Sequence, residues 1–200
     1  NLKSEQMKKK NNWIAMLLAL SFLVFSCTKE NSEISDLQKV RNNNNEKSYP
    51  VTKMDSAQAI SFITKQKIQE LFDLSTLYTS GNRDTEIDSV IYAQMKSYFA
   101  ETDSSKLKPI LNQLDSFKVK TAKVGNISVI KEIKGQDTLD FAKFEVEYFD
   151  NKERSIGKFE KNAQYILKLS PVKFKKEFKF YFVDFDVKPQ KDSTSTGVTK

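Results

Sequence analysis

The apolar residues of this chain change their spacing near Leu114, and that change constrains the fold more than any other feature of the sequence. Between residues 55 and 114 they recur at the spacing of one face of an α-helix. From residue 117 to 187 they alternate with polar residues, which is the pattern of a strand with one buried face. Helices that all precede the strands predict an α+β domain, with the helices packed on one face of a curved antiparallel sheet.

The helical part divides into three predicted helices. The first covers residues 55–79 and ends near Gly81, because glycine readily adopts the backbone conformations that close a helix. The second covers residues 85–100, with acidic residues near its start that suit the positive end of the helix dipole. The third covers residues 104–113, and Pro109 is compatible with it only in a first helical turn.

The alternating part predicts about four or five antiparallel strands. Turn-forming residues separate them, one turn falling at 135–137 and a hairpin loop at 150–153. The last strand, residues 174–187, carries apolar side chains on both faces. This pattern predicts either a central strand or a strand that bends so that each half buries a different side.

The first 26 residues have the pattern of a secretory signal peptide. Lysines at 8–10 precede an apolar run at 13–25, which is shorter than the ~20 apolar residues that a transmembrane helix requires. Met7 is the expected start of translation, so residues 1–6 are expected to be an over-extended start. We therefore expect export from the cytoplasm and removal of this segment.

Val24-Phe25-Ser26-Cys27 resembles a bacterial lipobox, in which an aliphatic and a small residue precede the cysteine that is lipidated. Cys27 is the only cysteine of the chain and falls at the position that the motif requires. The alternative is an ordinary signal peptide with a stray cysteine. The segment looks like lipoproteins of the Bacteroidetes group, which implies anchoring to the cell envelope by palmitate-type chains on Cys27. The implied location is the outer membrane, with the periplasmic or surface face left open.

The remaining chain divides into three expected parts. Residues 27–50 contain few apolar side chains and a run of asparagines at 42–45, which predicts a disordered tether between lipid and domain. Residues 51–187 hold all the predicted helices and strands and form a single domain. Residues 188–200 are rich in Ser, Thr and Lys, which predicts a disordered tail.

Composition removes several classes of chemistry. The chain has no His and one Cys, which excludes His-containing catalytic pairs, His-ligated metals, intramolecular disulfides and thiolate zinc clusters. No cofactor is implied. The formal charge of +7 falls to +4 without residues 1–26, which carry four Lys and one Glu, so no nucleic-acid partner is expected.

The lysine-rich run at 173–179 has two interpretations, attraction to an anionic surface or a solvated strand face.

The order of elements over residues 53–187 resembles the nuclear-transport-factor-2-like superfamily, also called cystatin-like cones. In that fold one long and two shorter helices close the open face of a strongly bent antiparallel sheet. The resemblance rests on element order, element length and the aromatic final hairpin, and it carries over no catalytic residue. Members include small-molecule isomerases and dehydratases, ligand-binding proteins and secretion-system components, so the resemblance implies a fold and leaves the function open.

A cone of this kind implies a space between helices and sheet that aromatic residues line. The candidate lining residues are Tyr78, Tyr98, Phe99, Phe144, Tyr148 and Tyr165. They form either an apolar pocket whose Tyr hydroxyls orient a ligand or a plain aromatic core. An isomerase-type enzyme also needs a buried carboxyl in the pocket, for which Asp73, Asp140 and Glu147 are available.

Together these features predict an envelope-anchored lipoprotein whose domain binds without catalysing, as an accessory of an envelope assembly. The main alternative is a carrier of a small apolar ligand in a cone-shaped pocket, and a further one is an isomerase or dehydratase of the same fold. Attachment to the membrane is expected through Cys27. The partner is then an envelope protein, a small apolar ligand or a second copy in a homodimer. An enclosed pocket favours the carrier or the enzyme, whereas an exposed apolar patch favours the interaction module.

Overall fold

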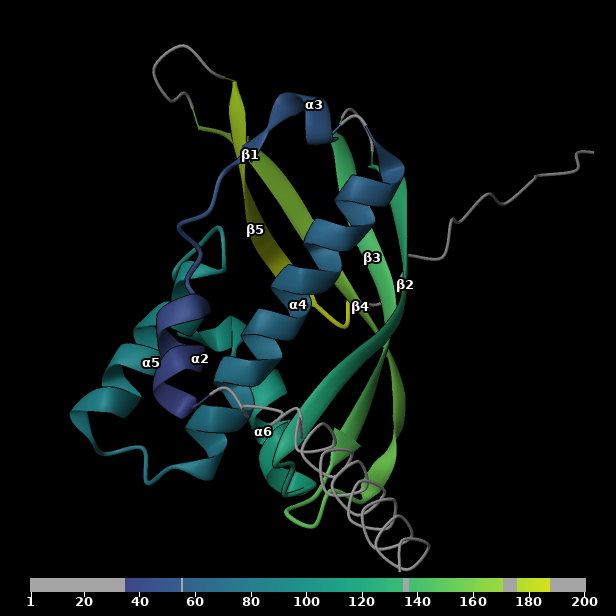
Figure 1. The fold of residues 1–200 in the computed structure, drawn as a ribbon. Coiled ribbons are helices and arrows are strands. Elements are labelled where there is room, and N and C mark those ends of the chain that lie inside the picture. The colour runs from purple at the N-terminus through teal and green to yellow at the C-terminus, as the bar shows by residue number, and fades with distance from the viewer. Residues whose placement is uncertain (1–34, 55, 135–136, 171–175, 188–200) are drawn as a thin grey trace, which may run out of the picture. The chain divides into compact units, whose positions relative to one another are not determined.

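The computed structural model describes residues 35–54, 56–134, 137–170 and 176–187. Over these residues the helices precede a strongly curled antiparallel sheet of five strands, a half-barrel that packs against the longest helix (Figure 1). The predicted α+β fold is confirmed. The expected signal peptide, Cys27 and the expected tail at 188–200 lie outside the described residues. Among the described residues, no helix combines the length and apolarity needed to cross a membrane.

The longest helix, α4 (Ala57–Ser80), extends along the sheet (Figure 1). Ser56 caps it by accepting a hydrogen bond from the backbone N–H of Ala59, and Gly81 follows its last residue, as predicted. Gly81 is extended rather than left-handed.

A glutamine side chain fixes α4 on the first long strand, β2 (Thr121–Lys134). The side-chain nitrogen of Gln69 donates to the carbonyl oxygen of Ala122 at 2.8 Å. Its side-chain oxygen accepts from the backbone N–H of Val124 at 2.8 Å. The amide therefore satisfies two backbone groups of β2 and sets the position of the helix along the strand.

Two shorter helices follow. α5 (Glu86–Ser97) begins with a capping box, in which the side chains of Thr85 and Asp88 each accept from the other's backbone N–H at 3.2 Å. A single 3-10 turn, η1 (Ser104–Lys106), leads into α6 (Lys108–Ser116). Pro109 stands in the first turn of α6, as predicted, where its missing N–H leaves no hydrogen bond unmade.

Four long antiparallel strands pair in chain order: β2, β3 (Asp137–Phe149), β4 (Ser155–Leu169) and β5 (Glu177–Phe185). A two-residue strand, β1 (Tyr49–Pro50), pairs with β5, which gives the order β1-β5-β4-β3-β2. The register shifts within β2 after Val124 and between β4 and β5 beside Tyr165. Bulges of this kind increase the local twist, and they accompany the curl of the sheet.

β5 confirms the prediction of a strand that bends. Phe180 and Phe182 are buried on the helix side of the sheet. The register shift then turns the strand, so that Phe185, three residues after Phe182, is buried as well. The bulge therefore explains why Phe185, which the sequence pattern places on the opposite face from Phe180 and Phe182, is buried with them.

Residues 35–50 differ from the predicted disordered tether. They form a short helix, α2 (Asp36–Asn42), and then β1, which leads into one further helical turn, α3 (Val51–Met54). α2 contacts α4, and Val40 packs against the core. Residues 35–50 are therefore part of the folded unit, and the rest of the expected tether, residues 27–34, lies outside the described residues.

The segment 43–50, which we call the strap, follows the free edge of β5. Asn45 donates from its side chain to the carbonyl oxygen of Phe180 at 2.8 Å, and β1 pairs with the start of the strand. Beyond the strap, Phe182 exchanges two backbone hydrogen bonds of 2.8 Å with residues 98 and 100. These contacts occupy backbone groups that an open sheet edge would offer to another chain.

Candidate functional site

The aromatic residues predicted to line a pocket lie almost entirely in the core. Five of the six expose 4 % of their surface or less: Tyr98, Phe99, Phe144, Tyr148 and Tyr165. Tyr78 is only partly buried at the end of α4, where its ring lies 5.4 Å from that of Tyr92. The structure therefore gathers five of the predicted residues and leaves Tyr78 at the margin.

Contacts between rings occupy the space between α4 and the sheet. The ring of Phe72 on α4 lies 6.3 Å from that of Phe144 and 6.2 Å from that of Tyr148, both on β3. Toward β5, the Phe182 ring lies 5.0 Å from that of Phe180 and 4.8 Å from that of Phe185. Centroid distances in this range are those of packed aromatic pairs. The arrangement favours an aromatic core over an open pocket.

A buried group of ionisable side chains lies beside this core, on α4. Lys67 exposes no surface, and its Nζ lies 3.0 Å from the carboxylate of Glu70, one turn further along the helix. The hydroxyl of Tyr98 donates to the same carboxylate oxygen at 2.9 Å, and Gln66 donates to the other at 2.8 Å. The Glu70 carboxylate thus has a cation and hydrogen bonds at both oxygens, as a buried charge requires.

Burial shifts the pKa values of Lys67, Tyr49 and Tyr98 away from their ordinary values. Loss of solvent lowers the pKa of Lys67, and the negative charge of Glu70 opposes that shift. Burial raises the pKa of Tyr49 in β1 to about 12, and Glu70 adds to the rise. The same two causes raise the pKa of Tyr98. Shifts of this kind occur at active sites and in structural ion pairs alike, so geometry must decide between them.

The Lys67–Glu70 pair lies beside the strap. The Tyr49 ring lies 6.0 Å from Lys67 Nζ, and Asn43 donates to the backbone carbonyl oxygen of Glu70 at 3.4 Å.

A carboxylate beside a tyrosine hydroxyl is the combination that an isomerase of this fold needs. Here neither Glu70 nor Tyr98 lines any of the three hollows described below.

The sequence contains an indication of the Lys67–Glu70 pair that the spacing of the apolar residues alone does not reveal. Lys67 lies four residues after Ile63 and four before Leu71, so it falls on the buried face of α4. A charged residue within an apolar stripe requires a buried partner, and Glu70 lies within one turn. Spacing indicates this pair, but the contribution of Tyr98, 28 residues from Glu70 in the chain, depends on tertiary structure.

The carboxyls considered for catalysis are spread over the fold. Asp73, on α4, accepts from Gln69 at 2.8 Å, and burial raises its pKa. Asp140 and Glu147 stand toward opposite ends of β3. Glu147 accepts from the Ser155 hydroxyl at 2.6 Å in an exposed position. The structure does not bring these three groups together.

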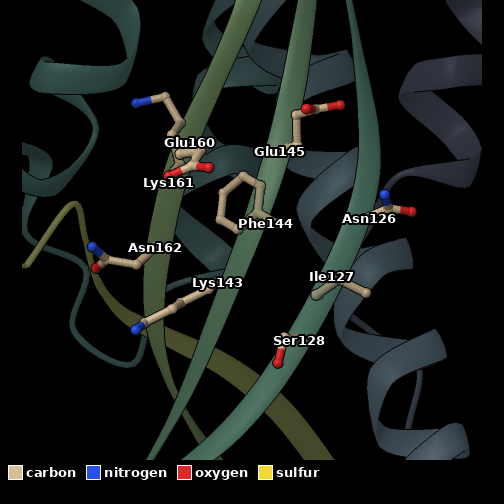
Figure 2. Close-up of a pocket in the computed structure, with 9 residues that line it drawn as sticks. All are labelled: Asn126, Ile127, Ser128, Lys143, Phe144, Glu145, Glu160, Lys161 and Asn162. Atoms are coloured by element: carbon tan, nitrogen blue, oxygen red, sulfur yellow. The ribbon is translucent and has the colours of Figure 1, made fainter.

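The hollow in Figure 2 has a volume of about 590 Å³ and lies on the sheet beside the bulge of β2. Three neighbouring strands line it, with Asn126, Ile127, Ser128, Lys143, Phe144, Glu145, Glu160, Lys161 and Asn162. Glu145 and Glu160 are direct cross-strand neighbours, and Lys158 contacts the Glu145 carboxylate at 3.2 Å. In Figure 2 the Lys143 amine and the Glu145 carboxylate point to opposite sides. Polar groups that diverge in this way do not fix a small ligand in one orientation.

Two further hollows lie near the end of α4. One of about 730 Å³ is lined from the end of α4 to the loop after β3, with Thr79, Phe117 and Ile156 among its residues. The other, about 280 Å³ and lined by residues of α2, α4 and α5, we call the α2–α5 groove. Its apolar lining residues are Leu37, Val40, Leu77, Ile87 and Ile91.

Neither the metal-ligating side chains nor a comparison with known proteins assigns a function to the chain. In the described part of the chain, no group of three or more His, Cys, Asp or Glu side chains could hold a metal ion. No protein-family model, curated protein or solved structure matches the chain.

Proposed function

We propose that this chain is a lipoprotein of the bacterial cell envelope, anchored by acyl chains on Cys27, whose domain binds another envelope protein without catalysing a reaction. The domain is then a non-enzymatic member of the nuclear-transport-factor-2-like superfamily, and the curled half-barrel is consistent with that cone-like fold. The anchor is supported by the basic residues, the apolar run and the lipobox-like Val24–Cys27, which occur in the order that lipidation requires.

The packed aromatic interior is the observation that carries the binding half of this proposal. A small-molecule site of this fold lies between helices and sheet, and contacts such as that of Phe72 with Phe144 occupy this space. Recognition is left to the outer surface, where large apolar side chains are exposed. Among the described residues, the most exposed are Phe62 at 70 %, Leu37 at 64 % and Leu169 at 59 %. Large apolar side chains exposed on a surface favour contact with a protein or a membrane.

The anchor is tested by expressing the full chain and its Cys27→Ser variant in a Gram-negative bacterium. We expect the parent chain in the membrane fraction, with an intact mass that corresponds to a start at residue 27 plus acyl groups. The variant lacks the thiol that accepts the lipid, so its mass carries no acyl groups. A parent chain that is cleaved elsewhere, or that carries no lipid, contradicts the anchor.

The binding role is tested by crosslinking in intact cells and by native mass spectrometry of the lipid-free chain, residues 28–200. We expect one envelope protein to be crosslinked reproducibly and the lipid-free chain to carry no additional mass. A retained small molecule would contradict this role and favour a carrier of apolar ligands, with the α2–α5 groove as its first candidate site.

A further inference from the structure

Three exposed apolar side chains gather at the α2–α5 groove. Leu37 exposes 64 % of its surface, Ile87 56 % and Val90 47 %. Leu37 and Ile87 both line the groove, and Val90 lies one turn after Ile87 on α5. We call these three residues the α2–α5 patch. Exposed apolar groups brought together from two helices are typical of an interaction surface.

Little chain separates this patch from the proposed anchor. Ser35, the cap of α2, follows Cys27 by eight residues, a distance of at most about 28 Å when extended and about 16 Å on average when flexible. Leu37 comes two residues later. An anchor at Cys27 would therefore hold Ser35, where the described residues begin, within about 28 Å of the lipid.

The charges around the patch are nearly balanced. Asp36 and Glu86 are acidic and exposed, and Arg41 and Lys120 are basic and exposed. Lys39 is half-buried and lies 3.5 Å from Asp36. Such a rim neither repels an anionic bilayer strongly nor draws the domain to it by charge. The apolar side chains are then the main source of any attraction to lipid.

We propose that the α2–α5 patch docks on the phospholipid bilayer that holds the anchor, with Leu37, Ile87 and Val90 inserted between headgroups and acyl chains. This inference rests on the proposed function, since it takes Cys27 as the anchor. The short tether holds the patch at a high local concentration beside the lipid, so that three apolar side chains suffice for binding that they would not sustain from free solution.

Docking also fixes which end of the domain remains free for a protein partner. Phe62 lies fifteen residues before Leu77 on α4, about 22 Å along the helix axis. Leu169, which is 59 % exposed and lies outside the patch, pairs with Phe178 beside β1. The end of α4 that carries Phe62 is thus remote from the groove and stays accessible when the patch is on the membrane.

The test uses the fluorescence of a single indole. Trp13 is the only tryptophan of the chain, and the proposed cleavage removes it. Leu37→Trp, Val90→Trp and the control Phe62→Trp are each made in the full chain, and the lipidated proteins are placed in phosphatidylcholine vesicles with brominated acyl chains. We expect the indoles at positions 37 and 90 to lose at least about half of their emission, and the indole at 62 to keep nearly all of it.

The intact mass of each sample separates failure of docking from failure of the anchor. Lipidated protein in which positions 37 and 90 are quenched no more than position 62 overturns docking and leaves the anchor standing. A chain without acyl groups overturns the anchor, and docking with it. Indoles at 37 and 90 that are shielded without vesicles, in proportion to protein concentration, show that a second copy covers the patch and also overturn docking. Quenching that requires anionic lipid contradicts an apolar contact.

Discussion

Two buried regions of this domain lie side by side on α4 and are stabilised in different ways. In the aromatic core, Phe72 contacts Phe144 and Tyr148 through ring surfaces, and the stabilisation comes from apolar area removed from water. At the strap contact, Lys67 and Glu70 are almost as deeply buried, but each polar atom there needs a specific partner. The core therefore supplies stability, whereas the strap contact supplies specificity.

This difference has an energetic consequence. A buried ion pair adds little net stability, because the loss of solvation offsets the attraction, yet removing one partner leaves an uncompensated charge. A buried ring has no such partner, and its removal costs the lost contact and the cavity. Substitutions in the two regions should therefore respond differently to compensation: a second change can restore the strap contact but not the core.

The largest effect is expected for Phe72→Ala. The substitution removes a ring that exposes 1 % of its surface and leaves a cavity against β3, so the free energy of unfolding should fall by about 3–5 kcal/mol. Urea denaturation followed by circular dichroism measures this change. Phe62→Ala is the matched control on the same helix, because Phe62 is 70 % exposed, and its effect should stay within about 0.5 kcal/mol. Equal effects at the two positions would contradict a packed interior.

Glu70→Gln should cost about 3 kcal/mol, because it leaves the Lys67 ammonium buried without its counter-charge. The amide oxygen still accepts from Tyr98, but the amide nitrogen then faces the Gln66 donor, so the loss includes that hydrogen bond as well as the ion pair. The double variant Lys67→Met/Glu70→Gln buries no charge and should recover most of the lost stability in the same urea measurement. A double variant no more stable than Glu70→Gln would show that Lys67 does more than balance Glu70.

The sequence predicts the parts of this fold that local patterns control. The change of spacing at Leu114 separates helices from strands, and Gly81 and Pro109 lie at the ends of helices, because helix termination and first-turn geometry depend on neighbouring residues. The strap escapes such reasoning. Asn43 and Asn45 are ordered by carbonyl oxygens 27 and 135 residues away in the chain, which composition cannot reveal.

The candidate site, like the strap, depends on contacts between distant residues that local sequence patterns do not predict. The aromatic residues are predicted to gather, because large apolar side chains are buried together. Whether they enclose a space or fill it depends on how far α4 lies from the sheet, and side chains such as Gln69 set that position through contacts with β2. Lys67 passes unnoticed because an i, i+3 pair with Glu70 is usually a solvated pair on a helix surface.

Asn45→Ala tests the strap itself. Asn45 donates to the carbonyl oxygen of Phe180 in a buried position and to that of Ser97 in a partly buried one, and its loss leaves both without that donor. We expect a loss of about 1–3 kcal/mol, with faster hydrogen exchange in residues 43–50. Asn44→Ala is the matched control, because the side chain of Asn44 bonds to Glu46 at 3.4 Å in an exposed position. Unchanged exchange in the strap of the Asn45 variant would contradict its role.

The smallest effect at neutral pH is expected for Tyr49→Phe, since the Tyr49 hydroxyl is buried without a hydrogen-bond partner among the described residues. Its stability should stay within about 1 kcal/mol of the parent. The variant differs above pH 10. Because burial raises the pKa of Tyr49 to about 12, the folded state keeps a proton that the unfolded state releases, and stability falls as pH rises from 10 to 12.

Lys67 acts in the opposite direction, because its lowered pKa lets the unfolded state hold more protons as pH approaches 10.5, and stability rises with pH there. Tyrosines with raised pKa values outnumber it, since Tyr98, Tyr148 and Tyr165 join Tyr49. The parent should therefore lose stability between pH 10 and 12, and Tyr49→Phe should lose less in urea titrations over that range. A loss as steep as the parent's would place Tyr49 outside the buried group and make the strap contact a surface feature, unlike the core beside it.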